Sequence, residues 1–274
     1  MTAFGIGPMT GMITLTTDFG LEDEYVGVMK GVILSICPAA TIVDITHGIS
    51  PQNRIQAAYI IDAAYRYFPA GTIHLAVVDP GVGTRRAMTA LRADGHVFLA
   101  PDNGVLSFLL QKEGVFAVRL TRSEYFLKSV STTFHGRDVF APAAAHLAAG
   151  ADLEALGEPV DCGALKTLDL GLPRIGADGR LSGTVVWADR FGNLTTSIDA
   201  ASLDAYLRSK PGGSKPVIRI GTCRIAGLSS TYADVEPGRA LALIGSRGYL
   251  EIAVNCGNAH KYLGINIHDP VFAE

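Results

Sequence analysis

Residues 72–79 read Thr-Ile-His-Leu-Ala-Val-Val-Asp, an apolar run that ends on a carboxylate. In an open α/β sheet, ligands bind in the crevice outside the carboxyl ends of the strands, so polar side chains gather there. The pattern therefore predicts an α/β fold with a functional site at the strand ends. It recurs three more times, in Ile13–Thr17 before Asp18, Thr41–Val43 before Asp44, and His96–Ala100 before Asp102.

Helical patterns alternate with these runs, as expected for right-handed βαβ units. The stretch 151–172 carries few pattern signals and is interpreted as a linker region. We expect an N-terminal α/β domain over residues 12–172 with a mostly parallel central sheet. The helices predicted within it are Tyr25–Ile36, Asn53–Phe68, Gly104–Lys112 and Pro142–Ala149.

Beyond Pro173 the pattern changes to short β-like runs separated by Gly, Asn and Ser. This spacing is typical of a small antiparallel barrel or sandwich. We expect a second, smaller domain, an antiparallel β-barrel, over residues 173–274. The predicted strands are Leu181–Ala188, Leu194–Ile198, Val217–Ile220, Ala240–Ile244 and Tyr249–Val254.

The composition narrows the class of protein. The chain has 274 residues, of which 48% are hydrophobic, and a net charge of -3, so no broad electrostatic attraction to nucleic acid or an anionic membrane is expected. Its four cysteines are scattered without a C-x-x-C pair, which favours reduced thiols. Met1–Gly11 lacks the features of a signal peptide, and no apolar run is long enough to span a bilayer. We expect a cytoplasmic protein with no nucleic-acid or membrane partner.

Several common catalytic and cofactor-binding motifs are missing from the sequence. There is no G-x-x-x-x-G-K-[ST] loop, and no G-x-G-x-x-G lies between a predicted strand and helix. Neither a G-x-S-x-G elbow nor an H-E-x-x-H helix occurs. We therefore expect no nucleotide cofactor bound by such loops, and less generic segments must carry the chemistry.

The segment 77–86, V-V-D-P-G-V-G-T-R-R, leaves a buried strand and returns with two adjacent guanidinium groups. It could simply be an Asp-Pro-Gly turn with solvated arginines. Alternatively, Asp79 and an arginine form a fixed pair at a strand end, in which the cation keeps the carboxylate ionised and oriented.

The segment 133–142, T-F-H-G-R-D-V-F-A-P, places an imidazole just before an Ala-rich helix. As a helix N-terminus, it would use Asp138 as the cap and Pro142 at the first position. That interpretation leaves His135 unexplained, so His135 is a candidate functional residue.

Two segments of the second domain could bind a ligand. In 189–196, D-R-F-G-N-L-T-T, Phe191 offers a stacking face and Asn193 an amide that can read the donor and acceptor edges of an adenine, although the segment could be a polar hairpin. In 245–255, G-S-R-G-Y-L-E-I-A-V-N, Ser246 and Arg247 suit a carboxylate, although the segment could be a turn that opens an edge strand.

Taken together, these segments resemble the S-adenosyl-L-methionine (SAM) hydroxide adenosyltransferases, or SAM hydrolases, which share their fold with the fluorinases and chlorinases. The resemblance runs from Met12 to nearly the C-terminus. It rests on the order and separation of five motifs: T-T-D-F-G, V-V-D-P-G-V-G-x-x-R-R, F-H-G-R-D-x-F-A-P, D-x-F-G-N and S-x-G-x-L-E-I-A-V-N.

The resemblance implies hydrolysis of SAM to adenosine and L-methionine by a homotrimer whose substrate lies between one subunit's first domain and its neighbour's second. It implies a catalytic triad of Asp79, Arg86 and His135, with Asp18 holding the ribose and no metal or cofactor. The other matched positions are Asp23, Asp189, Ser246 and Arg247 for the methionine moiety, and Phe191, Asn193 and the backbone around Asn255 and Cys256 for adenine. Tyr232 is expected to be a second stacking face.

Two departures from the halogenase pattern favour hydrolysis. This chain has Asp79 where the fluorinase has a tyrosine, and Gly136 where it has a halide-contacting serine. Loss of the serine alone would still permit a chlorinase-like halogenase. A carboxylate beside the reacting carbon, however, would repel a halide and accept a hydrogen bond from water.

Two further alternatives remain open. Asp18, Asp23 and Asp44, with His47 nearby, could hold a divalent metal for nucleoside or phosphate-ester hydrolysis. A binding or sensing module that holds adenosine or its methionine conjugate without turnover is the non-enzymatic alternative.

Overall fold

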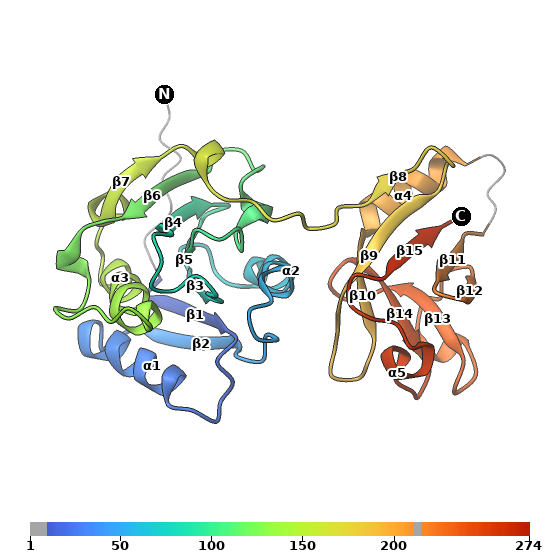
Figure 1. The fold of residues 1–274 in the computed structure, drawn as a ribbon, viewed down its shortest axis with the longest axis horizontal. Helices are drawn as coiled ribbons and strands as arrows, with labels where there is room; N and C mark the ends of the chain where they lie inside the picture. The colour runs from blue at the N-terminus through green and yellow to red at the C-terminus, as the bar shows by residue number, and fades with distance from the viewer. Residues whose placement is uncertain (1–9, 211–214) are drawn as a thin grey trace. The chain divides into compact units, whose positions relative to one another are not determined.

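The computed structural model describes residues 10–210 and 215–274 (Figure 1). The chain divides into two compact units, Met1–Leu168 and Asp169–Glu274. The domain limits expected from the sequence, 12–172 and 173–274, stay predictions. Of the segment Met1–Gly11, residues 1–9 lie outside the described residues.

The N-terminal unit is built on a seven-stranded sheet in the order β2-β1-β3-β5-β4-β6-β7. The first four strands in this order pair in parallel, whereas β4 is antiparallel to β5 and β6, and β7 is antiparallel to β6. The prediction of a mostly parallel sheet is therefore confirmed. The strands are β1 (Met12–Thr17), β2 (Thr41–Thr46), β3 (Ile73–Val77), β4 (Met88–Ala93), β5 (His96–Pro101), β6 (Phe116–Leu120) and β7 (Gly157–Val160).

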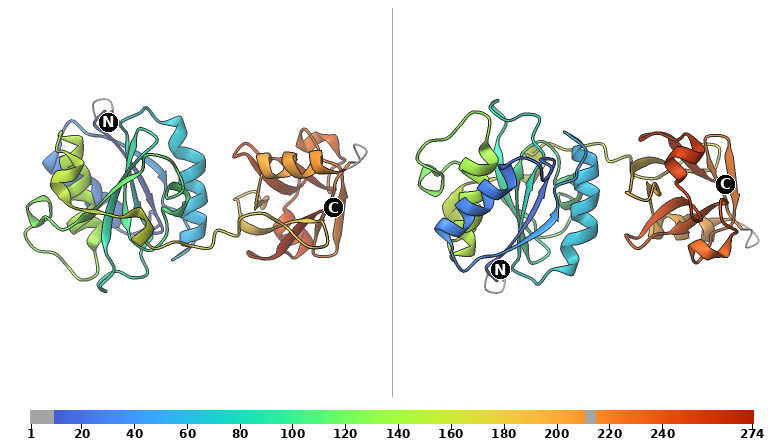
Figure 2. Two further views of the ribbon diagram at one scale, coloured as in Figure 1. Left: turned by 90° about the horizontal axis from the view of Figure 1, so that it is seen from above. Right: turned by 90° about the horizontal axis from the view of Figure 1, so that it is seen from below.

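Helices cover both faces of this sheet (Figure 2). On one face, α1 (Tyr25–Ile36) and α3 (Ala141–Ala148) bury Met29, Ile33 and Ala144 against the side chains of β1 and β3. On the other face, α2 (Arg54–Ala64) packs its Ala57 and Ile61 into a second core. Burial of apolar side chains on both faces explains why the central strands are almost continuously hydrophobic.

Three expectations about the N-terminal unit were wrong. Gly104–Lys112 is not a helix beyond the short 3₁₀ turn Ser107–Leu109, because Gly104 has φ +90° and the Ser107 hydroxyl accepts from the backbone N–H of Leu168 at 2.8 Å. The region 151–172 is not only a linker, since it contains β7, whose Glu158 and Pro159 hide the strand pattern. Asp44 lies inside β2 rather than after its end.

The predicted helix Asn53–Phe68 is shorter in the structure at both ends. Asn53 accepts a hydrogen bond from the backbone N–H of Gln56 and caps α2, which ends at Ala64 and continues as the 3₁₀ turn Tyr65–Tyr67. The strands β4 and β6 give too short an alternation to be detected in the sequence. The remaining predicted helices and strands of this unit lie where expected to within one or two residues.

The C-terminal unit is an eight-stranded antiparallel sheet in the order β12-β11-β15-β9-β10-β14-β13, with β8 paired to β9. The two ends of this order, β12 and β13, also contact each other, so the predicted small barrel is confirmed. Two short helices, α4 (Ala200–Ser209) and α5 (Ala259–Leu263), complete the unit. The strands are β8 (Arg174–Ile175), β9 (Leu181–Ala188), β10 (Leu194–Asp199), β11 (Val217–Ile220), β12 (Cys223–Ala226), β13 (Ala240–Ile244), β14 (Tyr249–Val254) and β15 (Pro270–Ala273).

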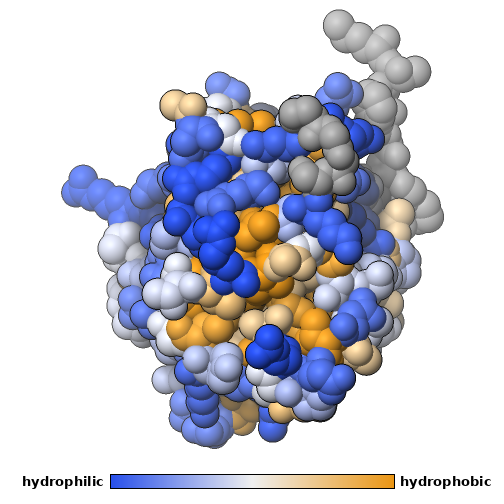
Figure 3. Space-filling model, turned by 90° about the vertical axis from the view of Figure 1, so that its right-hand side faces the viewer, coloured by the Kyte–Doolittle hydropathy of each residue, from blue (hydrophilic) through white to orange (hydrophobic). Residues whose placement is uncertain are grey.

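In the view of Figure 3, hydrophobic side chains gather in an area bordered by hydrophilic ones. Apolar areas of this kind often mark contacts with other molecules. Within the described residues, none of the helices is both long and apolar enough to cross a membrane.

Two histidines are buried in the sheet of the N-terminal unit. His74 Nδ1 lies 2.8 Å from Thr14 Oγ1, and His74 Nε2 lies 3.2 Å from His96 Nδ1. The His74 ring also stacks on Phe98 with 4.9 Å between the ring centroids. Burial, with a smaller contribution from His96, lowers the pKa of His74 from 6.5 to about 3, and burial lowers the pKa of His96.

This pair should make the protein acid-sensitive. Because the folded state holds His74 neutral while the unfolded chain binds a proton below pH 6.5, unfolding gains protons and stability falls as the pH drops. We expect a loss of about 1–2 kcal/mol from His74 between pH 6.5 and 5, measured by urea unfolding. The double variant Thr14→Val/His74→Phe should have a flatter pH dependence. Equal slopes in the wild type and this variant would contradict the assignment.

Candidate functional site

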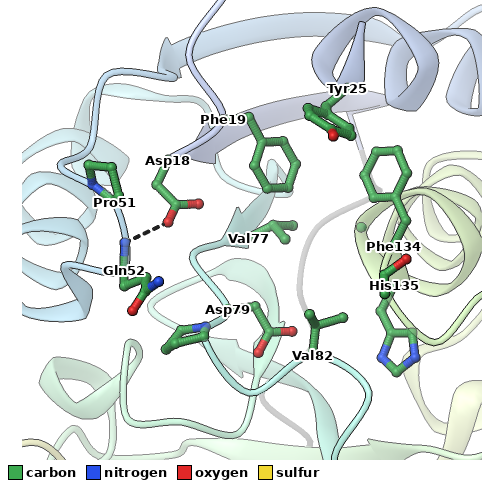
Figure 4. A pocket seen from close by; sticks show the side chains of 13 residues that line it. Asp18, Phe19, Tyr25, Pro51, Gln52, Val77, Asp79, Val82, Phe134 and His135 are labelled. Carbon is green, nitrogen blue, oxygen red and sulfur yellow. Dashed lines mark hydrogen bonds between the residues drawn. The ribbon is translucent and has the colours of Figure 1, made fainter. Parts of the chain in front are cut away.

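A cavity of about 440 Å³ opens at the carboxyl ends of β1 and β3 (Figure 4). Four loops form it: those after β1, β2 and β3, and the loop that precedes α3. This is the edge of the sheet at which the strand-end pattern predicted a site. The lining residues are Asp18, Phe19, Tyr25, Pro51, Gln52, Val77, Asp79, Pro80, Val82, Thr133, Phe134, His135 and Gly136.

Asp79 and Arg86 form a bidentate ion pair beside this cavity. The Arg86 Nε donates to Asp79 Oδ1 at 2.8 Å, and its Nη2 donates to Asp79 Oδ2. Their side chains are only 6% and 3% exposed, so Arg86 is not a solvated arginine, unlike its exposed neighbour Arg85. Both interpretations of the segment therefore hold in part, since the backbone N–H of Gly81 also donates to Asp79 Oδ1 as an Asp-Pro-Gly turn requires.

The topology of the sheet explains why this pair forms. Asp79 and Arg86 lie on one connection, residues 78–87, between β3 and β4. Because β4 runs antiparallel to its neighbour β5, the chain passes from the carboxyl end of β3 directly to the start of β4 at the same edge of the sheet. No helical crossover is needed, and both ends of the connection remain beside the cavity.

Arg86 also contacts His135, with its Nη2 lying 3.0 Å from His135 Nδ1. A guanidinium group can only donate, so Nδ1 must accept, and the neutral ring then carries its proton on Nε2. Burial and the Arg86 charge lower the pKa of His135, whereas Asp79 and Asp138 oppose this shift. The three residues expected to form a triad are therefore in mutual contact through Arg86.

Hydrogen bonds to the Asp138 carboxylate hold the loop that carries His135. Asp138 is fully buried and accepts from the backbone N–H of Ser131 at 2.7 Å and from Arg137 Nε at 2.6 Å. It therefore ties the loop together and is not the helix cap that the sequence predicted. Residues Gly136–Phe140 form a π-helical turn that leads into α3. A Cβ at Gly136 would lie 3.2 Å from Phe134 and from Met29, so a side chain larger than hydrogen would crowd the cavity wall.

The two carboxylates expected at the first loop differ in position. Asp18 lines the cavity, and its Oδ2 accepts from the backbone N–H of Gln52 at 2.7 Å. Asp23 is exposed in the loop before α1 and is not among the lining residues. Asp102 accepts from the backbone N–H of Lys166 at 2.8 Å and serves the packing of that segment instead.

A second cavity, of about 850 Å³, lies in the C-terminal unit. All eight residues of this unit that the sequence analysis selected for substrate binding line it. The lining residues are Asp189, Phe191, Asn193, Tyr232, Ser246, Arg247, Glu251, Val254, Asn255, Cys256, Gly257 and Asn258.

Asp189 organises one side of the second cavity, because its Oδ1 accepts from the backbone N–H groups of Phe191 and Asn193, both at 2.9 Å. The ring of Phe191 is 75% exposed and is available for stacking. On the other side, the Tyr232 hydroxyl donates to Glu251 at 2.6 Å. That bond, together with burial, raises the pKa of Tyr232 to about 12, so its hydroxyl keeps its proton.

Three other polar groups complete the second cavity. Arg247 lies over the ring of Trp187, with 4.4 Å from its guanidinium carbon to the ring centroid. The Asn255 side chain donates to the carbonyl of Val235 at 2.7 Å, which supports the loop around Cys256. Cys256 has φ +54°, an uncommon backbone conformation for a residue other than glycine.

Sequence reasoning missed several lining residues. Phe19, Tyr25 and Phe134 form an aromatic cluster with ring centroids 5.2–5.9 Å apart. Phe19 and Phe134 lay inside quoted motifs without being singled out, and Tyr25 lay outside them. Gln52 reaches the site through the fold of the loop after β2, which no local pattern predicts. Glu251 lies within a predicted strand and was taken as part of its pattern.

Asp18, Asp23, Asp44 and His47 do not form a metal-binding cluster in the structure. The Asp44 carboxylate contacts Lys30 Nζ at 2.6 Å and His47 Nε2 at 3.1 Å, and Asp23 is exposed. Across residues 10–210 and 215–274, no group of three or more His, Cys, Asp or Glu side chains is placed to hold a metal ion. The carboxylates that suggested the metal alternative thus have other partners or stand apart.

Comparison with known proteins covers most of the chain. Residues 13–157 match the family model of the SAM hydroxide adenosyltransferase N-terminal domain, and residues 183–272 match that of the C-terminal domain. A solved structure described as an uncharacterized conserved protein from Thermotoga maritima aligns with a TM-score of 0.85 and 37% identity, covering 96% of this chain and 99% of that one.

Named relatives agree with the family models. A protein of Salinispora tropica named (R)-S-adenosyl-L-methionine hydrolase is 38% identical over 95% of this chain and 96% of its own length. One of Thermus thermophilus with the same name is 40% identical over 93% and 96%. A fluorinase of Nocardia brasiliensis is 32% identical over 92% and 93%. The chain therefore belongs to the SAM hydroxide adenosyltransferase family.

Proposed function

We propose that this protein hydrolyses SAM to adenosine and L-methionine. The observation that carries the proposal is the contact of Arg86 with both Asp79 and His135 beside a strand-end cavity that also holds Asp18. Relatives at 37–40% identity bear the name of this activity, which supports the same chemistry here.

The reaction places few demands on acid catalysis. The sulfonium leaves C5′ as a neutral thioether, so the leaving group needs no proton, and the difficulty is to bring water into line with that carbon. In our proposal, the Nε2–H of neutral His135 donates to the water oxygen, and Asp79 accepts a proton of the same water in a hydrogen bond. The remaining lone pair attacks C5′ as the carbon–sulfur bond breaks, and the released proton leaves towards Asp79.

Arg86 has a positioning role in this scheme. It occupies one lone pair of each Asp79 oxygen, but a carboxylate can accept about four hydrogen bonds, so Asp79 can still bind the water. By donating to His135 Nδ1 it also keeps the Nε2–H directed away from itself. The same guanidinium therefore sets the orientation of both groups that hold the nucleophile.

Halogenation fits the cavity less well. The Asp79 carboxylate would repel a halide at the position of the water. Gly136 supplies no hydroxyl for a halide, and its crowded surroundings leave little room for one. A chlorinase-like activity is therefore not favoured by any contact in the cavity.

The second cavity offers groups that can bind the adenine and the methionine moiety of SAM. We propose that Phe191 and Tyr232 form the faces of the adenine pocket, with Asn193 and the loop of Asn255 and Cys256 at its edge. Ser246 and Arg247 suit the methionine carboxylate, and Asp189 and Asp23 suit its ammonium group. Each cavity is lined by residues of one unit alone. In our proposal the two halves of a site come from two copies of the chain, as the family resemblance implies.

We further propose that the chain forms a homotrimer in the cytoplasm, with each substrate between the N-terminal unit of one subunit and the C-terminal unit of the next. The apolar area in Figure 3 is available for subunit contact. The four cysteines are free thiols, as suits a reducing compartment.

Removing the water-holding groups should reduce turnover far more than binding. We expect His135→Ala and Asp79→Ala to lower kcat about 10²–10⁴-fold with little change in the adenosine Kd, measured by product chromatography and calorimetry. Arg85→Ala, which changes an exposed neighbour, is the control and should keep wild-type kcat. Parallel losses of kcat and adenosine affinity would contradict these roles.

The acid limb of the pH profile should report His135. A protonated ring can no longer accept from Arg86, and burial and that same cation lower its pKa below 6.5, so kcat/KM should fall only at a pH below 6.5. Arg86→Gln removes the cation, so the acid limb of its residual activity should move to higher pH. A wild-type limb above pH 6.5, or a limb that the variant leaves in place, would count against the assignment.

Mixed assemblies can test the shared site. Chains with His135→Ala and chains with Arg247→Ala, carrying different affinity tags, are co-expressed and purified through both tags. If each site joins neighbouring subunits of a closed trimer, every mixed trimer contains one pair with both halves intact, and about one third of wild-type activity should return. A site confined to one chain predicts activity no higher than that of the two variants alone.

A further inference from the structure

His47 is a buried residue that the proposed chemistry does not use. It lies just after β2, is 5% exposed, and its Nδ1 lies 2.8 Å from the hydroxyl oxygen of Thr17. Thr17 is the last residue of β1 and directly precedes Asp18, which lines the first cavity. The position of His47 thus connects the second strand to the end of the first.

His47 holds both ends of the segment that carries Asp18. Its side chain contacts Thr17, and its carbonyl oxygen accepts from the backbone N–H of Gly20 at 2.9 Å. Gly20 has φ +69°, a left-handed conformation that glycine adopts without strain. Between these two points, only Asp18 and Phe19 remain, and both line the cavity.

Other contacts make the arrangement stiff. The Thr17 hydroxyl also accepts from the backbone N–H of Phe19 at 3.2 Å. His47 Nε2 lies 3.1 Å from Asp44 Oδ1, an ion-pair distance without hydrogen-bond geometry, and Lys30 binds the same carboxylate. The negative charge favours the ring proton on Nε2, which leaves Nδ1 to accept from the Thr17 hydroxyl.

We propose that His47, acting through Thr17, is a positioning residue for Asp18. The inference rests on the proposed function, in which the Asp18 carboxylate binds the ribose hydroxyls. A carboxylate that binds a diol must be held to within a fraction of an ångström, and groups behind it usually supply that precision. The backbone N–H of Gln52 also donates to the Asp18 side chain, so two residues that follow β2, His47 and Gln52, contribute to its position.

The test replaces the Thr17 hydroxyl without changing the size of the side chain. Thr17→Val should weaken adenosine binding about tenfold in calorimetry and raise the KM for SAM more than it lowers kcat, because ribose contacts exist before and during the reaction. Thr17→Ser keeps the hydroxyl and should stay within about twofold of wild type.

The same strand offers a matched control. Thr14 also contacts a buried histidine, His74, at 2.8 Å, but it lies three residues before the site. Thr14→Val should lower the Tm by a similar amount and leave adenosine binding unchanged. If Thr17→Val weakens binding no more than Thr14→Val does, His47 has only a structural role and the inference fails.

A double-mutant cycle tests whether Thr17 acts on adenosine binding through Asp18. In an Asp18→Asn background, Thr17→Val should lose most of its effect on adenosine binding, because it acts through Asp18. An undiminished effect would overturn the inference. If Thr17→Val does not fold, His47→Asn, whose amide oxygen can take the place of Nδ1, is compared with His47→Leu in the same way. A wild-type protein that neither binds adenosine nor forms it from SAM would refute the proposed function itself.

Discussion

The first cavity depends on one guanidinium group that donates in two directions. Arg86 binds Asp79 through Nε and Nη2, and the same Nη2 contacts His135. The side chains of Arg86 and Asp79 are both nearly buried. Without this cation, the buried carboxylate would lose its counter-charge and two hydrogen-bond donors, and the imidazole would lose the donor that fixes its tautomer. The loops after β3 and before α3 would also lose their main polar contact.

The position of Arg86 is in turn a consequence of the sheet. A parallel strand after β3 would require a long crossover, which would carry an arginine seven residues after Asp79 into the body of a helix. The antiparallel β4 instead returns it to the same edge, next to the loop of His135. The mixed character of the sheet is therefore directly connected with its chemistry.

Much of this organisation could be predicted from the sequence, and the exceptions have physical causes. The helix Tyr25–Ile36 and the strand Leu181–Ala188 were predicted at their observed bounds because their apolar residues recur over most of each element. The strand β7 was missed because Glu158 and Pro159 hide its pattern. The segment Gly104–Lys112 was wrongly predicted as a helix, because the conformation of Gly104 and the contact of Ser107 with Leu168 override its local pattern. Asp138 was taken for a helix cap, since its burial beneath Ser131 depends on a loop that no periodicity describes.

The placement of Arg247 over Trp187 has a practical consequence. Trp187 is the single tryptophan of the chain, and it is 4% exposed beneath that guanidinium. An anion that draws the cation away from the indole alters the electric field across the ring and hence the energy of its emitting state. Because Arg247 also lines the second cavity, the emission of Trp187 is a built-in signal for an anion that binds there, without any attached dye.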